Sequence, residues 1–342
     1  MLKIDGQDGG GQLLRTSLSL SLVTGEPFSM TAIRGQRAKP GLMRQHLTAV
    51  NAAIEISGGS ADGAVLGSTE LVFAPQRVKG GDYRFSIGTA GSTCLLYQAL
   101  LPALLLANEP STLRLEGGTH NPMAPTFDFL SECFLPVLQK MGADVELELE
   151  RYGFYPAGGG SLLAKVEPCT GGLKPIELLD RGKPLRREIR VISAHVPDSV
   201  GEREGAIVLG VLEAAGWGVE GVSVRSVDSA GAGNVVCAAL QSEQVCEMTI
   251  AFGERGKSGK RVAHDAAKAM RDYLGTGAVV GRRLADQLLL PIALAGAGEF
   301  LTMKPSKHTL TNAALIQQFL DVKIDISEQE DGQWKVSVSP SA

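Results

Sequence analysis

The sequence predicts an α/β protein of the α+β type, in which three β-α-β-α-β-β repeats form a large domain around a pseudo-threefold axis and a smaller α/β domain is inserted. The first observation is an internal repeat with three copies. In each copy a glutamine begins an apolar run, predicted to be a helix, and a short apolar strand, a polar loop and a second helix follow. The glutamine and a loop residue lie 22, 22 and 21 positions apart in the pairs Gln12 and Arg34, Gln98 and His120, and Gln287 and His308. The second observation is a stretch of different pattern between the second and third copies.

The helices and strands of the repeats follow from periodicity. Residues 16–23 alternate like a strand, but the matching segments of the other two copies do not, so we predict a helix there. The second helices place apolar residues three and four positions apart, over residues 130–141 in the second copy and 315–320 in the third. Two strands follow each second helix, for example 144–150 and 161–166.

The stretch between the second and third copies has the pattern of a small α/β unit, with a strand, a helix, further strands and a last helix. The first strand and the two helices span residues 188–194, 202–215 and 262–274. We therefore predict a discontinuous three-repeat domain, residues 1–183 and 276–342, and an inserted domain, residues 184–275.

Composition narrows the functional classes. The net charge of −4 argues against a protein that coats nucleic acid by bulk charge, so any polyanion site must be a local group of Arg and Lys. The five cysteines are odd in number and form no CxxC pair, which is typical of a reducing compartment. No export signal is visible, and the longest apolar run, residues 100–107, is too short to span a bilayer. We expect a cytoplasmic protein without a membrane partner; the oligomeric state has no sequence signal.

The repeat also predicts where a site forms. If the three copies pack around a common axis, their equivalent loops and glutamines lie together. Each loop precedes the N-terminus of a second helix, where free N–H groups and the helix dipole favour anions. We therefore expect a polar, anion-binding centre built by all three copies. The alternative is that Gln12, Gln98 and Gln287 are ordinary surface residues of their helices.

A glycine-rich loop from Asp5 to Arg15 precedes the first helix. Glycines let backbone N–H groups approach a phosphate, Arg15 can reach the same group, and Asp8 can hold a divalent ion. A tight turn at the start of a helix is an equally good explanation of this segment alone.

The loop of the first copy is basic. Its cations, and the two polar residues that follow them, are Arg34, Arg37, Lys39, Arg44, Gln45 and His46. Such a cluster suits phosphates, which arginine binds through two parallel hydrogen bonds. The alternative is a solvated basic face.

His308 lies in the loop of the third copy, before a helix for which Thr311 or Asn312 is the predicted cap. Nearby cations keep an imidazole neutral, so that a ring nitrogen can attack a phosphorus atom. A lone loop histidine is more often merely solvated, and His120, in the equivalent loop of the second copy, is an equal candidate from the pattern alone.

Residues 251–258 fit a loosened P-loop pattern, Ala-Phe-Gly-Glu-Arg-Gly-Lys-Ser. We do not expect this segment to bind a nucleotide, because the insert has only about 90 residues and no acidic strand end is available for magnesium.

Several segments together resemble the RNA 3'-terminal phosphate cyclases over nearly the full length of the chain. They are residues 8–15, 33–46, 80–91, 153–160, 284–300 and 305–312. The resemblance implies three βαβαββ repeats with an inserted domain, RNA with a 3'-phosphate end and ATP as substrates, and Mg²⁺ or Mn²⁺. In the implied reaction a histidine takes AMP from ATP, AMP passes to the RNA 3'-phosphate, and the vicinal 2'-OH displaces AMP to give a 2',3'-cyclic phosphodiester.

Matched by position, the resemblance implies roles for individual residues. His308 corresponds to the histidine that takes AMP, and Asp8 to an acidic residue that is usually Glu and is implied in metal binding. The implied ATP-site residues are Gln12, Gln98, Pro125, Arg283, Asp286 and Gln287. The implied contacts to phosphates or to the RNA end are Arg15, Arg34, Arg37, Gln45 and His46. His46 is also a hypothetical base for the 2'-OH, and Arg283 stands where a relative has Tyr against adenine.

Two rival functions belong to other classes. Catalytically silent relatives act in ribosome biogenesis as RNA-binding proteins, but they lack the histidine that corresponds to His308. A transferase for a phosphorylated small molecule is the second rival, because repeated βαβ folds also serve that chemistry.

Overall fold

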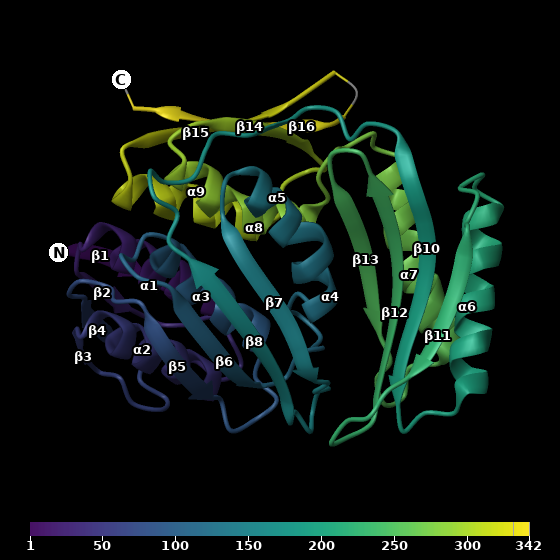
Figure 1. The fold of residues 1–342 in the computed structure, drawn as a ribbon, viewed down its shortest axis with the longest axis horizontal. Coiled ribbons are helices and arrows are strands. Elements are labelled where there is room, and N and C mark those ends of the chain that lie inside the picture. The colour runs from purple at the N-terminus through teal and green to yellow at the C-terminus, as the bar shows by residue number, and fades with distance from the viewer. Residues whose placement is uncertain (331, 342) are drawn as a thin grey trace.

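The chain folds into small mixed sheets and the helices that cover them (Figure 1), which confirms the predicted α/β class. The computed structural model describes residues 1–330 and 332–341. Within these ranges, no helix combines the length and the apolar character that crossing a membrane requires.

Three successive sets of elements correspond to the three predicted copies. The first consists of β1 (Leu2–Asp5), α1 (Gly10–Thr24), β2 (Phe28–Thr31), α2 (Arg44–Ser57), β3 (Ser60–Asp62) and β4 (Leu71–Ala74). The second consists of β5 (Gly81–Ser86), α3 (Thr93–Leu105), β6 (Ser111–Gly117), α4 (Phe127–Phe129), the π-helix η1 (Leu130–Phe134), α5 (Leu135–Lys140), β7 (Asp144–Arg151) and β8 (Gly160–Glu167). The third consists of β9 (Glu177–Leu178), α8 (Arg282–Leu294), β14 (Gly298–Thr302), α9 (Lys307–Phe319), β15 (Val322–Glu328) and β16 (Trp334–Pro340).

The three sets have the same sheet topology, with the orders β1-β2-β4-β3, β5-β6-β8-β7 and β9-β14-β16-β15. Counted in chain order, the first and second strands of each sheet are parallel. The fourth strand in the chain lies between the second and the third and is antiparallel to both. A parallel pair needs a crossover connection, which α1, α3 and α8 provide. These three helices therefore occupy equivalent places in the three sets. The helix predicted over residues 16–23 is confirmed as part of α1.

The insert lies inside the third copy, which corrects our prediction that it precedes that copy. Its elements are β10 (Pro184–Ala194), α6 (Asp198–Glu213), β11 (Gly221–Ser226), β12 (Gly233–Ser242), β13 (Cys246–Phe252) and α7 (Gly259–Leu274). They follow β9, which pairs with β14. Because β9 has only two residues, it carries no alternation that a sequence pattern can reveal. The division of the chain into two domains stays a prediction.

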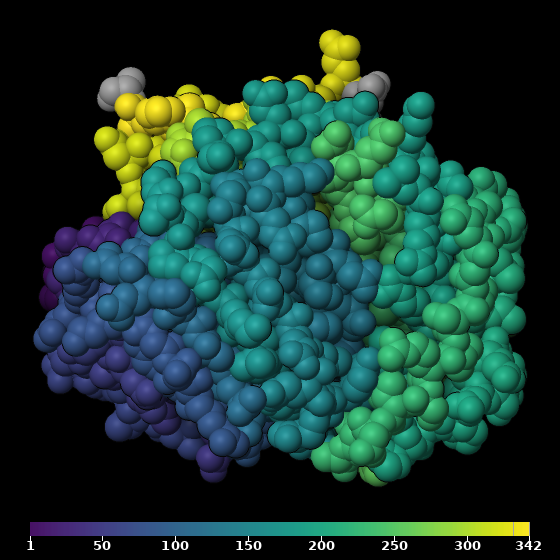
Figure 2. Space-filling model, viewed as in Figure 1, coloured from purple at the N-terminus to yellow at the C-terminus, as the bar shows by residue number. Residues whose placement is uncertain are grey.

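The sheet of the insert packs on both faces. Successive residues of a strand point to opposite sides, so Val191 and Val236 join the apolar core around α6 and α7, whereas Ile192, Val235 and Cys237 join the core of the three copies. The space-filling view shows the insert lying directly against the second copy (Figure 2). The insert thus shares a continuous apolar core with the rest of the chain.

A buried carboxyl group connects the insert to α8. Glu247, in β13, has 4% of its surface exposed, and its Oε2 accepts a hydrogen bond from the backbone N–H of Gly281 at 2.8 Å. Gly281 immediately precedes α8, so the carboxyl satisfies a backbone donor at the start of that helix. Burial raises the pKa of Glu247 to about 7, although the hydrogen bond from Gly281 and the nearby Arg283 guanidinium lower it.

Glu247 predicts a pH-dependent stability. Its pKa in the native state lies above the ordinary value of 4.5, so native protein binds the proton more tightly, and stability is lost as the pH rises through this interval. We expect E247Q, whose amide oxygen can accept the same hydrogen bond, to gain about 3 kcal/mol of unfolding free energy over the wild type between pH 5 and pH 8. Urea unfolding of both proteins at the two pH values measures this gain, and an equal difference at both would contradict it.

Candidate active site

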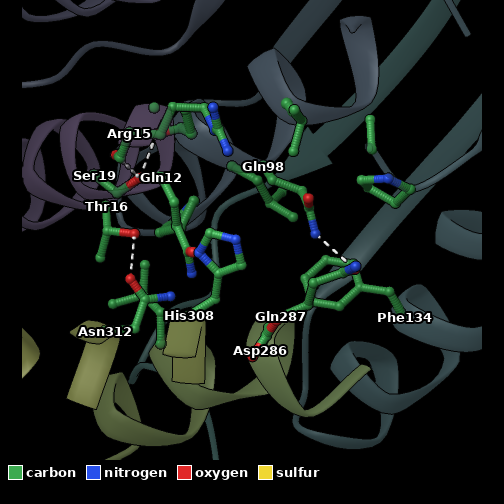
Figure 3. A pocket seen from close by; sticks show the side chains of 18 of the residues that line it. Gln12, Arg15, Thr16, Ser19, Gln98, Phe134, Asp286, Gln287, His308 and Asn312 are labelled. Carbon is green, nitrogen blue, oxygen red and sulfur yellow. Dashed lines mark hydrogen bonds between the residues drawn. The ribbon is translucent and has the colours of Figure 1, made fainter. Parts of the chain in front are cut away.

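A cavity of about 640 Å³ opens where the three copies meet (Figure 3). The structure brings together every predicted site residue except Asp8. The predicted residues in its wall are Gln12, Arg15, Arg34, Arg37, Gln45, His46, Gln98, Pro125, Arg283, Asp286, Gln287 and His308. Their functional roles stay predictions. The rest of the wall is largely apolar and includes Phe134 of η1 and Leu138 of α5.

Hydrogen bonds between side chains and neighbouring helices connect all three copies at this cavity. The Thr16 hydroxyl of α1 donates to Asn312 Oδ1 of α9 at 3.0 Å. The Ser19 hydroxyl of α1 donates to the Ala99 carbonyl of α3 at 2.7 Å. Gln98 and Gln287 join α3 to α8 through a hydrogen bond of 2.8 Å. Each pair of copies is therefore joined, and the equivalent glutamines of the second and third copies meet directly (Figure 3).

Three of these residues were missed by the sequence analysis, and helical spacing could have found them. Thr16 and Ser19 lie four and seven positions after Gln12, and Asn312 lies four positions after His308. Residues so spaced share one face of a helix. A site residue at one position therefore predicts that its neighbours one or two turns later face the same cavity.

His308 lies in the first turn of α9, not in the loop before it, which corrects the predicted start of this helix. The cap is Ser306, whose Oγ accepts the N–H of Thr309 at 3.0 Å; we had expected Thr311 or Asn312. The imidazole is exposed and points into the cavity, toward Gln12 (Figure 3). The helix start thus presents the ring to whatever the cavity binds.

Asp286 of α8 fixes the start of α9. Its Oδ1 accepts hydrogen bonds from the hydroxyls of Ser306, at 2.8 Å, and Thr309. Burial raises the pKa of Asp286, and the two hydroxyls and the nearby His308 lower it. The carboxyl therefore holds the residues on both sides of His308 in sequence, which limits where the imidazole can lie.

In the part of the chain that the structure describes, Arg15, Arg34 and Arg37 of the cavity wall form no ion pair with a carboxylate. Exposed arginines elsewhere, such as Arg84 with Glu116, are paired. Burial lowers the pKa of Arg15 to about 10, and burial together with the Arg37 charge lowers the pKa of Arg34. Because positive charge that is both clustered and partly desolvated is costly, this wall favours an anionic ligand.

His46 is placed as a hydrogen-bond donor. Its Nδ1 accepts the backbone N–H of Met43 at 3.1 Å, so a neutral ring carries its proton on Nε2. Burial, and the charges of Arg15 and Arg34, lower the pKa of His46 to about 3. A Cβ at Gly11 would lie 2.3 Å from Nε2, so only glycine permits this approach to the glycine-rich loop. The role of His46 as a base stays a prediction; with Nδ1 engaged by the Met43 N–H, the neutral ring has a proton on Nε2 to donate.

Arg283 packs against the protein. Its Nη1 donates to the Ala124 carbonyl at 3.1 Å, and its guanidinium carbon lies 5.8 Å from the centre of the Phe129 ring. Burial lowers the pKa of Arg283, and Glu247 raises it. Because Ala124 precedes Pro125 in the cavity wall, Arg283 holds this part of the wall in place.

Three other candidates lie away from the cavity. Asp8 is exposed, and one of its oxygens accepts a hydrogen bond from the Gln36 amide. His120 is 1% exposed, and its Nε2 lies 2.6 Å from Asp128 Oδ2, so its ring is already engaged. In the P-loop-like segment, the Lys257 ammonium lies 2.9 Å from the Asp265 carboxylate, which leaves it poorly placed for a phosphate.

Comparisons with known proteins give a single family. A sequence model described as RNA 3'-terminal phosphate cyclase matches residues 7–326. A protein of that name from Koribacter versatilis (strain Ellin345) is 49% identical over 333 residues, covering 97% of this chain and 93% of the relative. Another, from Ectopseudomonas mendocina (strain ymp), is 47% identical over 337 residues, covering 98% of each chain. A third, from Ralstonia nicotianae (strain ATCC BAA-1114 / GMI1000), is 48% identical over 335 residues, covering 96% of this chain and 94% of the relative.

The His46 geometry predicts its tautomer. We expect the ring to stay neutral from pH 5 to pH 8, with the proton on Nε2, because burial and two arginines lower its pKa to about 3 and Nδ1 is engaged by Met43. Long-range ¹H–¹⁵N NMR correlation of histidine-labelled protein, assigned by comparison with His46→Gln, measures both properties. A ring that titrates in this interval, or one protonated on Nδ1, would contradict the assignment.

Proposed function

Because the chain belongs to the RNA 3'-terminal phosphate cyclase family, we propose that it converts the 3'-terminal phosphate of RNA into a 2',3'-cyclic phosphodiester and cleaves ATP to AMP and pyrophosphate. This is chemistry of the ATP-dependent ligase class. The observation that carries the proposal is the cavity where the three copies meet, in which His308 lies beside cations without carboxylate partners. A phosphate monoester is a poor electrophile, so the enzyme must first give it a better leaving group.

In the first step, a nitrogen of the His308 imidazole attacks the α-phosphorus of ATP. A P–N bond forms, the bond from the α-phosphorus to the bridging oxygen breaks, and pyrophosphate leaves. Arg15, Arg34 and Arg37 neutralise the charge of the phosphates, which costs little because the cations are already gathered. The adenine and ribose lie along the remaining wall, which includes Gln98, Gln287 and apolar side chains.

In the second step, an oxygen of the RNA 3'-phosphate attacks the phosphorus of the histidine-bound AMP. The P–N bond breaks and leaves an RNA-(3')pp(5')A anhydride. In the third step, the vicinal 2'-OH attacks the 3'-phosphorus and gives its proton to water. The bond from the 3'-phosphorus to the bridging oxygen breaks, AMP leaves with that oxygen, and the cyclic diester closes. The hydroxyl is already adjacent to the activated phosphorus, so proximity supplies most of the advantage.

Two residues prepare the site without changing covalently. Asp286 restrains the helix start that carries His308, through its bonds to Ser306 and Thr309. His46 donates from Nε2 to a phosphate oxygen, since its Nδ1 is occupied by the Met43 N–H. A neutral donor beside the arginines strengthens anion binding without adding charge.

Mg²⁺ or Mn²⁺ is the proposed cofactor. Within the described residues, no three His, Cys, Asp or Glu side chains form a metal-binding group. Mg²⁺ keeps several waters and takes one or two protein carboxylates together with substrate phosphates, so we propose that the ion arrives with the triphosphate. Asp286 lines the cavity and Asp8 does not, so Asp286 is the carboxylate that would hold the ion there. When bound, the ion neutralises and orients the phosphates.

The proposal predicts a covalent histidine adduct. Incubation with α-³²P-labelled ATP and Mg²⁺ or Mn²⁺ should label the wild type through a bond that is labile to acid and stable to alkali, as expected for a phosphoramidate. We expect H308A to abolish the label, because the attacking nitrogen is gone. Gel electrophoresis of the denatured protein measures it.

Two matched variants control this labelling experiment. H264A removes an exposed histidine of α7, and K257A removes the lysine of the P-loop-like segment; both should retain label within about twofold, because neither residue lines the cavity. Normal labelling of H308A would refute the nucleophile. An unlabelled wild type would favour a non-catalytic, RNA-binding member of the family.

The order of the steps predicts the fate of modified RNA ends. An RNA with a 3'-OH lacks the acceptor phosphate and should not discharge the His308 adenylate. An RNA with a 3'-phosphate on a 2'-deoxy terminal sugar keeps the acceptor and lacks the internal nucleophile, so it should accumulate as the adenylated end. Gel separation of the labelled RNAs distinguishes these products. If the 2'-deoxy end failed to take AMP while the ribose end cyclised, the sequential mechanism would be wrong.

A further inference from the structure

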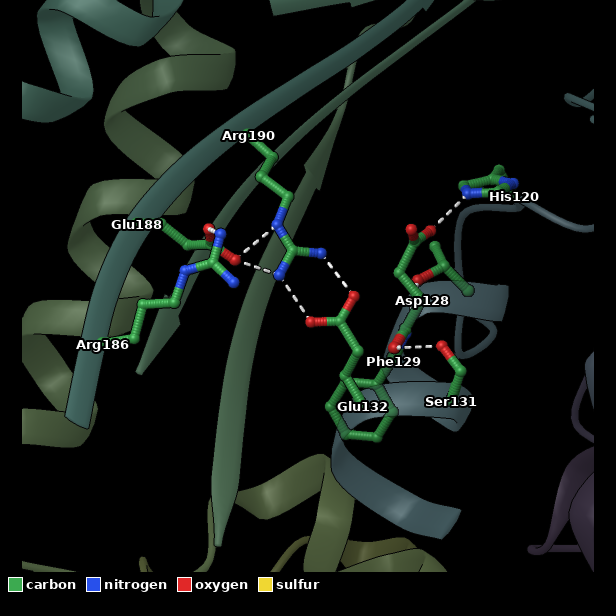
Figure 4. A network of polar contacts seen from close by, with 9 residues as sticks. His120, Asp128, Phe129, Ser131, Glu132, Arg186, Glu188 and Arg190 are labelled. Atoms are coloured by element: carbon green, nitrogen blue, oxygen red, sulfur yellow. Dashed lines mark hydrogen bonds and ion pairs between the residues drawn. The ribbon is translucent and has the colours of Figure 1, made fainter. Parts of the chain in front are cut away.

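The insert contacts the cavity wall from outside. Phe134 and Leu138 line the cavity and belong to η1 and α5, the second helix of the second copy. We had predicted one regular helix over residues 130–141, but its beginning is a π-helix. The opposite side of η1 faces the sheet of the insert, to which it is bound by an arginine (Figure 4).

We infer that Arg190 of the insert is a positioning residue for ATP: it holds η1 through Glu132 so that Phe134 forms the wall of the nucleotide cavity. The inference rests on the proposed function, because it assigns that cavity to ATP. It gives the insert a role in the reaction, although none of its residues between 184 and 275 lines the cavity.

The contact between Arg190 and Glu132 is bidentate. Both terminal nitrogens of Arg190 donate to the two carboxylate oxygens of Glu132, and its Nε donates to Glu188 at 2.6 Å. The Arg190 side chain is 18% exposed, and the side chains of Glu132 and Glu188 are 34% and 12% exposed. Parallel charge-assisted hydrogen bonds of this kind fix orientation as well as distance. Lysine, a point charge, cannot reproduce them.

The segment that Arg190 contacts is a π-helix. Its i→i+5 pattern, here from the Leu135 N–H to the Leu130 carbonyl, is rare in proteins and appears mostly as single turns at functional sites. Consecutive residues of η1 have different surroundings: Glu132 binds Arg190, Cys133 is buried in the apolar core, and Phe134 lines the cavity. A shift of η1 relative to the insert therefore moves Phe134 as well.

The insert also contacts a second part of the cavity wall. Glu247, which follows Cys246 in β13, accepts the Gly281 N–H where α8 begins, and α8 carries Arg283, Asp286 and Gln287. Arg283 in turn lies over Phe129 of α4, which directly precedes η1. The insert thus contacts η1 through β10 and the start of α8 through β13, and both η1 and α8 line the cavity.

Removal of Arg190 leaves Glu132 and Glu188 close together, with only Arg186 to neutralise them. Two partly buried carboxylates repel each other, so η1 moves away from β10. Arg186 supplies the matched control: it lies on the same strand and pairs with Glu188 at 2.5 Å, but its side chain is 65% exposed and, within the described part of the chain, it makes no hydrogen bond to Glu132. Because the Arg186 guanidinium is largely solvated, we expect its pair with Glu188 to contribute little.

The experiment compares Arg190→Met, Arg190→Lys and Arg186→Met in the full-length protein. We measure KM for ATP, KM for 3'-phosphorylated RNA and kcat of cyclisation, together with Tm. We expect KM for ATP to rise about tenfold in Arg190→Met, the order of one lost anchoring contact, and severalfold in Arg190→Lys. KM for RNA and kcat should change less than twofold, and Arg186→Met should match the wild type.

The outcomes separate positioning from simple instability. If a variant only loses stability, part of the protein is unfolded and inactive, so the apparent kcat falls in proportion while both KM values stay unchanged. This result for Arg190→Met would overturn the inference. Should Arg190→Met not fold, Arg190→Lys decides, and an unchanged KM for ATP in folded Arg190→Lys would also overturn it. A wild type without ATP-dependent activity would instead refute the proposed function.

Discussion

The convergence of equivalent helices on one polar centre is the constraint on which the rest of the structure depends. Each crossover helix follows the same path in its sheet, so their polar faces meet where no single copy could form a cavity. The bond of Thr16 with Asn312 satisfies polar groups that would otherwise be buried unpaired, and the bond of Gln98 with Gln287 joins two partly buried amides in the cavity wall. An unpaired buried donor or acceptor costs about 1–3 kcal/mol, so these contacts favour one arrangement of the copies over alternatives of similar apolar burial.

The electrostatics of the cavity follow from the same arrangement. The glycine-rich loop and the basic loop of the first copy supply cations, while the third copy supplies His308 and Asp286 from the other side. The carboxyl of Asp286 is engaged by hydroxyl groups rather than by an arginine, so it positions a helix start without neutralising the cations. His46 contributes a donor and no charge. The centre therefore keeps an excess of positive charge, although the net charge of the chain is −4. An anionic substrate neutralises this local positive charge.

The sequence predicted which residues lie together at the cavity, but it did not predict the hydrogen bonds that orient them or the elements that surround them. Repeat spacing is written along the chain, so Gln98, Gln287 and His308 could be aligned without coordinates. The place of the insert could not be predicted, because the two-residue strand β9 gains its identity only by pairing with β14. The tautomer of His46 depends on the Met43 backbone. The helical period at residues 130–141 was visible, but it does not distinguish an α-helix from the π-helix over Leu130–Phe134. The contact of Glu132 with Arg190 was not visible, because the two residues are 58 positions apart in the chain.

The position of the insert in the chain explains how it can influence a cavity that it does not line. The chain leaves the third copy after β9 and returns at α8, the helix that carries part of the cavity wall. Any rigid unit placed in this connection necessarily has one end at α8. A single further contact is then sufficient to relate α8 to another helix. The Arg190–Glu132 pair makes this contact, and the other helix is η1. The two attachments, through Arg190 in β10 and Glu247 in β13, therefore connect η1 and α8, which both contribute side chains to the cavity wall.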